Sequence, residues 1–121
     1  MTVEKAIEVC KNHGWNVDLE NYSNGQQYLI AQHSPAGEDF SFNIDADESG
    51  NNFANEVRMY SATFDPDDHI EMWIEARKNG VKDVPSTREL VKDAEAIEKM
   101  LQTLAAALTE AEYESNRMQN I

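Results

Sequence analysis

Apolar residues recur at helical spacing in four stretches of the 121-residue chain, which predicts four helices. These stretches are residues 2–13, about 51–63, about 66–79 and about 87–115. Two of them carry helix-start signals: Asp65 precedes Pro66, and Ser86 and Glu89 form a capping box. In the last stretch, apolar residues step by four and three positions alternately, which is a heptad-like seam. The seam consists of Leu90, Ala94, Ile97, Leu101, Leu104, Leu108 and Ala111.

The seam has two interpretations. It packs on the protein's own sheet and helices, or its exposed half pairs with a second copy and makes a homodimer. We favour packing within one chain, because helices gain most of their stability from tertiary contacts.

Between the first two helical stretches, the chain alternates apolar and polar residues, which is typical of half-buried strands. The alternating segments are residues 15–22, 26–33 and 39–44, separated by turn signals at 23–25 and 34–37. We therefore expect an α+β fold: an N-terminal helix, a three-stranded antiparallel meander and three helices, the last one long. Residues 1–121 are expected to form a single domain with an acidic part at 1–85, a helix at 86–115 and a frayed tail at 116–121.

The formal net charge of −13 is unevenly distributed along the chain. Residues 1–75 contain 15 Asp and Glu against 3 Lys and Arg, whereas residues 76–121 contain 8 and 7. A concentrated negative field repels nucleic acid and anionic membranes and attracts basic partners. We therefore expect no direct nucleic-acid or membrane binding, and a basic protein surface as the partner.

The acidic residues that we expect to contact this partner lie in two groups. Asp67, Glu71 and Glu75 are spaced i, i+4, i+8, so they line one helix face about a turn (~5.4 Å) apart. This spacing approximates that of successive phosphates in nucleic acid, although for any one helix a solvated face is the better explanation of such a row. The full predicted partner-binding set is Asp65, Asp67, Asp68, Glu71 and Glu75, followed by Asp45, Asp47 and Glu48.

Residues 45–56 also resemble an EF-hand calcium loop. Asp45, Asp47 and Glu56 fall at its acidic positions, Ser49 at an oxygen-ligand position, and Gly50 at the turn. Against this, the preceding segment is a predicted strand, and no second loop is present. The alternative is an acidic strand-to-helix turn in which Ser49 caps the helix.

Nothing in the sequence predicts an enzyme, and no cofactor other than this calcium ion is suggested. The histidines are scattered, and His69 beside Asp65 and Asp68 is the one candidate base or metal ligand. The single cysteine, Cys10, lies at helical spacing in an apolar stripe and fits a small core residue in a reducing, cytoplasmic protein. The N-terminal segment of the chain is charged, so we expect no signal peptide.

A small, strongly acidic α+β chain of this kind is similar to the anti-CRISPR and anti-restriction DNA mimics encoded by phages and mobile elements. The segments SPAGEDFSF (34–42) and FDPDDHIEMWIEARKNG (64–80) also resemble segments of small proteins on mobile elements of Gram-positive gut bacteria. The resemblance implies an inhibitor that mimics nucleic acid and occupies the basic groove of a nucleic-acid-binding defence protein. It transfers no individual functional residue.

Overall fold

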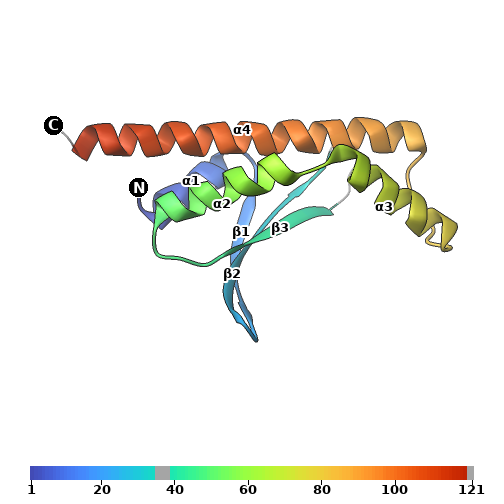
Figure 1. Ribbon diagram of the computed structural model, residues 1–121, viewed down its shortest axis with the longest axis horizontal. Helices are drawn as coiled ribbons and strands as arrows, with labels where there is room; N and C mark the ends of the chain where they lie inside the picture. The colour runs from blue at the N-terminus through green and yellow to red at the C-terminus, as the bar shows by residue number, and fades with distance from the viewer. Residues whose placement is uncertain (35–38, 120–121) are drawn as a thin grey trace.

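The computed structural model describes residues 1–34 and 39–119 and confirms the predicted α+β fold (Figure 1). Only Ser34 of the turn predicted at 34–37 lies within the described residues. In chain order the elements are α1 (Val3–Asn12), β1 (Asn16–Tyr22), β2 (Gly25–His33), β3 (Asp39–Asp45), α2 (Gly50–Thr63), α3 (Pro66–Lys78) and α4 (Thr87–Gln119).

Local hydrogen bonds fix both ends of α1. Oγ1 of Thr2 accepts a hydrogen bond from the backbone N–H of Lys5 (3.1 Å), which caps the helix. At the other end, Gly14 has a φ of +86°, and the N–H of Trp15 donates to the carbonyl oxygen of Cys10 (3.0 Å). Because the Trp15 side chain is buried, this cap also anchors the start of β1 in the core.

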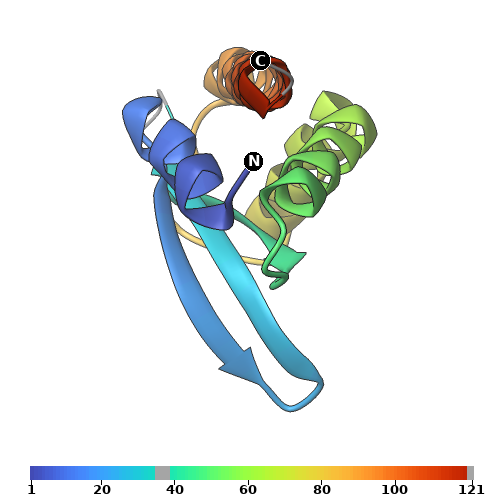
Figure 2. The ribbon, with the colours of Figure 1, turned by 90° about the vertical axis from the view of Figure 1, so that its left-hand side faces the viewer.

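The three strands form an antiparallel sheet in the order β1-β2-β3. Ile30 of β2 pairs with Val17 of β1 and Phe42 of β3, and all three side chains point to the helix-covered face. Leu19 points to this face too, yet 51% of it is exposed, because the β1–β2 hairpin projects beyond the helices (Figure 2). At its tip, Gly25 has a φ of +128°.

The helices cover one face of the sheet, with α1 over β1, α2 over β3, and α4 across the outside of α1, α2 and α3 (Figures 1 and 2). Aromatic rings fill the layer between α2 and the sheet, where Phe42 stacks on Tyr60 with 4.3 Å between ring centroids. Fully buried Ile30, Phe53 and Leu101 join the strands and helices into one core.

The predicted seam of α4 is buried within the chain. Its residues from Leu90 to Leu108 have no exposed surface, and Ala111 is half-buried. The interpretation that the seam packs on the protein's own helices is therefore confirmed. The predicted end of the helix at 115 is wrong, because α4 continues to Gln119. Fraying of residues 116–121 stays a prediction, and the last two residues lie outside the described part.

Candidate acidic binding surface

Helix α3 turns its carboxylates to solvent and its apolar side chains toward the rest of the protein. Asp67, Glu71 and Glu75 are all exposed, so the row predicted from their spacing exists on the surface. Trp73 and Ile74, on the other side of the helix, are half-buried. The helix is thus amphipathic in the sense that the sequence predicts.

The first turn of α3 adds two carboxylates. Asp65 is the N-cap, and its Oδ1 accepts a hydrogen bond from the N–H of Asp67 (2.9 Å), while Pro66 occupies the first turn. Asp68 is exposed in the same turn. Acidic groups here are stabilised by the positive end of the helix dipole, so the sequence can concentrate charge at this point.

Cations near α3 leave most of this charge uncompensated. Nζ of Lys78 lies 3.5 Å from Oε1 of Glu75, and both groups are exposed. Arg77 donates instead to the carbonyl oxygen of Pro85 and to Oγ1 of Thr87, which attaches the loop before α4. Within the described residues, no Lys or Arg pairs with any other carboxylate of α3. The acidic row is therefore open to a partner.

Arg58 is the only Lys or Arg between residues 45 and 75, and it faces away from this surface. Its Nη1 lies 2.9 Å from Oε2 of Glu112 and 3.2 Å from Oγ1 of Thr109, both on α4. The arginine thus joins α2 to α4 and does not neutralise the acidic segment in which it occurs.

The outer face of the sheet is also acidic. The register places Asp18 and Glu20 of β1 and Asp39 and Asp45 of β3 on the side away from the helices. No Lys or Arg occurs in any of the three strands. His33 lies beside Asp39, with 2.8 Å between Nδ1 and Oδ1, and both are exposed.

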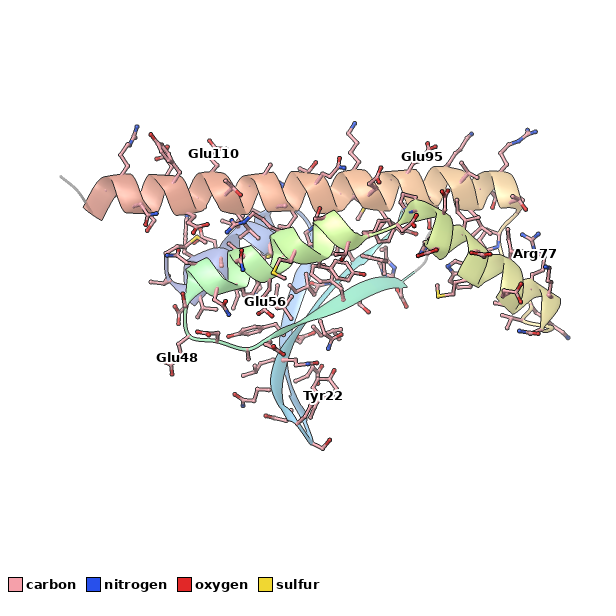
Figure 3. All side chains as sticks on the ribbon, viewed as in Figure 1. Tyr22, Glu48, Glu56, Arg77, Glu95 and Glu110 are labelled. Atoms are coloured by element: carbon pink, nitrogen blue, oxygen red, sulfur yellow. The ribbon has the colours of Figure 1, made fainter. Side chains whose placement is uncertain are left out.

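The two predicted groups of contact residues do not form one cluster. Asp45, Asp47 and Glu48 lie at the start of α2, whereas the α3 carboxylates follow its end (Figure 3). The 14 residues of α2 separate the groups by about 20 Å at 1.5 Å per residue. The predicted contact residues therefore form two acidic regions, one at each end of α2.

The residues of the predicted calcium loop serve the start of α2. Asp47 accepts hydrogen bonds from the N–H of Ser49 (2.9 Å) and the amide of Asn52 (3.3 Å), and Ser49 caps the helix. Oε1 of Glu56 accepts from the N–H of Asp45 (3.4 Å). Among the described residues, no group of three or more His, Cys, Asp or Glu is placed to hold a metal ion. The structure thus shows the capped strand-to-helix turn of the alternative interpretation, and calcium binding by 45–56 stays a prediction.

His69 contacts a different carboxylate from those expected. Its Nε2 lies 3.8 Å from Oδ2 of Asp93 on α4, and burial lowers the pKa of His69 while Asp93 opposes that change. Sequence reasoning missed Asp93, although it falls three residues after Leu90 and so lies beside the buried seam. A charged residue beside the apolar seam was the signal in the sequence that could have identified this buried pair.

Cys10 is a core residue, as its position in an apolar stripe predicts. Its side chain is fully buried in α1, and burial raises the pKa of the thiol to about 12. Because the thiolate is the reactive form, this cysteine is inert at neutral pH.

Along the part of the chain that the structure describes, no helix combines the length and apolarity that a membrane span requires. Comparison of the chain with protein families, with curated proteins and with solved structures gives no match.

Proposed function

We propose that this protein is a non-enzymatic acidic binding protein that docks on the basic groove of a nucleic-acid-binding protein. Its carboxylates would take the places of phosphates, and the bound protein would block the groove, as an anti-CRISPR or anti-restriction inhibitor does. The observation that carries this proposal is the exposed and largely uncompensated row of Asp67, Glu71 and Glu75 on α3.

Beyond the first turn of α3, where the helix dipole stabilises Asp67, this row adds little to the stability of its own fold. Like charges one helical turn apart are unfavourable by a few tenths of a kcal/mol per pair. Within the described residues, only Glu75 of the three has a cationic partner, and that pair is exposed and worth little. An intermolecular role would explain the row, because Arg and Lys of a partner form charge-assisted hydrogen bonds with carboxylates.

Three basic residues lie together on a face of α4, which gives the field a direction. Arg88, Lys92 and Lys99 share a face of α4 with Glu95, which points away from the sheet (Figure 3). The strands, by contrast, contain no Lys or Arg. A basic groove would therefore approach from the side of α3 and the sheet, and its association rate would be raised by the field.

The test is capture from a bacterial lysate on the immobilised full chain, followed by elution with a double-stranded DNA oligonucleotide. We expect basic nucleic-acid-binding proteins to be retained and then displaced by the DNA, because both compete for one groove. A variant with Asp67→Lys, Glu71→Lys and Glu75→Lys is expected to retain none of them.

The matched control places three charge reversals on α4 instead, at Glu89→Lys, Glu95→Lys and Glu110→Lys. All three residues are exposed, and the change in net charge equals that of the α3 variant. We expect this control to retain the same proteins as the wild type. Equal capture by the α3 variant, or captured proteins that DNA does not displace, would contradict the proposal.

A further inference from the structure

A groove with a volume of about 490 Å³ lies where the start of β3 meets the junction of α2 and α3 (Figure 1). Its inner walls include the half-buried rings of Tyr60, Phe64 and Trp73. Met72, which also lines it, is 57% exposed. An apolar surface of this kind, open to solvent in a small protein, is typical of a binding groove.

The edge of the groove is acidic. Asp39, Asp65 and Asp68 all line it and are all exposed, whereas the rings are withdrawn, so the carboxylates surround an aromatic interior. Among the residues that the structure describes, no Lys or Arg lines the groove. His69 does, but burial lowers its pKa and keeps it neutral at pH 7. The groove is therefore complementary to a single positive charge carried on an apolar stem.

The three carboxylates differ in how far they are already engaged. Asp39 lies 2.8 Å from the ring of His33, and one oxygen of Asp65 caps α3. The side-chain carboxylate of Asp68 makes no hydrogen bond or ion pair with any residue that the structure describes. Asp68 is thus the carboxylate most available to a ligand.

We propose that this groove binds an arginine side chain of the basic partner, an inference that rests on the function proposed above. Arginine fits better than lysine for two reasons. Its planar guanidinium stacks on aromatic faces, and it forms paired hydrogen bonds with a carboxylate. Lysine presents a compact, strongly hydrated charge that gains less from an aromatic wall. The α3 row then attracts both lysine and arginine of the partner, and the groove selects arginine over lysine.

The experiment uses the full-length ¹⁵N-labelled protein and two synthetic peptides, one of nine lysines and one with arginine in place of the central lysine. We expect the arginine peptide to bind at least fivefold more tightly and to shift the indole N–H signal of Trp73. The signal of Trp15, which is 2% exposed and does not line the groove, reports that the fold is intact.

Two variants that each remove one charge locate the preference. Asp68→Asn is expected to bring the two peptides to equal affinity, because it alters the groove. Asp67→Asn, on the outer row, is expected to weaken both peptides by the same factor and to keep the preference for arginine. A preference for arginine that Asp68→Asn retains, or that arises without any shift of the Trp73 signal, would overturn the assignment of the groove.

The outcomes separate this inference from the proposed function. Equal, salt-dependent binding of both peptides by the wild type overturns the arginine groove and leaves the acidic surface standing. Failure of both peptides to bind overturns the groove and also contradicts an acidic surface that attracts basic partners.

Discussion

Nε2 of His69 lies 3.8 Å from Oδ2 of Asp93, and this pair joins α3 to α4 at a point almost closed to solvent. The two side chains are 10% and 0% exposed, and the rings of Phe40 and Phe64 lie beside the imidazole. Helix α3 itself contains no fully buried residue. A polar contact therefore helps to hold the helix that presents the acidic row.

The first prediction concerns pH. Because burial lowers the pKa of His69 below its ordinary value of 6.5, the unfolded chain takes up the proton first. The contribution of His69 to the free energy of unfolding is therefore complete above pH 6.5 and is lost as the pH falls through its folded pKa, by at most about 1.4 kcal/mol per pH unit.

Denaturant unfolding of the wild type and of His69→Gln between pH 7.5 and 5.5 measures this effect. The wild type is expected to lose its advantage over the variant on acidification. A difference that stays constant, or that grows as the pH falls, would show that His69 gains its proton more readily in the folded protein.

The second prediction concerns Glu56, whose pKa is shifted in the opposite direction to that of His69. Burial raises the pKa of Glu56, and the nearby Asp45 and Asp47 add to this rise, so its ionised form is disfavoured in the folded protein. Glu56→Gln keeps an acceptor for the N–H of Asp45 and removes the charge. We expect its melting temperature to exceed that of the wild type at pH 7, and the difference to shrink as the pH falls through the raised pKa of Glu56 and to vanish below pH 4.5. A less stable variant at pH 7 would show that the carboxylate is needed in its ionised form.

The third prediction concerns the contact between the N-terminus and α2. The N–H of Gly50 donates to the carbonyl oxygen of Met1 (3.2 Å), and a Cβ on Gly50 would lie 2.6 Å from that oxygen and 2.2 Å from the carbonyl oxygen of Thr2. Gly50→Ala is expected to lower the free energy of unfolding by about 1–3 kcal/mol. Alanine in a helix otherwise stabilises by roughly 0.5–1 kcal/mol. A neutral or stabilising effect would therefore show that this close approach is not maintained in solution.

The fourth prediction concerns the seam of α4. Leu101 is fully buried, so Leu101→Ala is expected to cost about 2–5 kcal/mol of unfolding free energy. The neighbouring Gln102 is exposed, and Gln102→Ala is expected to change stability by no more than about 0.5 kcal/mol. Similar effects of the two substitutions in a strictly monomeric protein would contradict the packing of α4 described above.

Features that depend on neighbouring residues in the chain could be predicted from the sequence. The cap at Asp65 and Pro66 forms as expected, because both groups act on the backbone within one turn. The exposure of Glu71 and the burial of Leu101 follow from the helical period alone. Fold class and element order rest on such local signals, which is why they agree with the structure.

Features that depend on how the elements pack could not be predicted. Asp47 and Asp67 belong to one predicted contact set, and the distance between them depends on how α2 and α3 pack. The turn of Arg58 toward Glu112 depends on α4 lying across α2. The aromatic groove likewise needs β3 to meet α3, and no spacing along the chain specifies that meeting.

The central claim is that the carboxylates of α3 bind a basic surface. Its most direct test is a calorimetric titration of the captured partner with the wild type, the α3 triple variant and the α4 triple variant at about 50 and 200 mM salt. The account predicts binding that weakens with salt in the wild type, near-equal binding in the α4 variant, and none in the α3 variant. Undiminished binding by a folded α3 variant would contradict it.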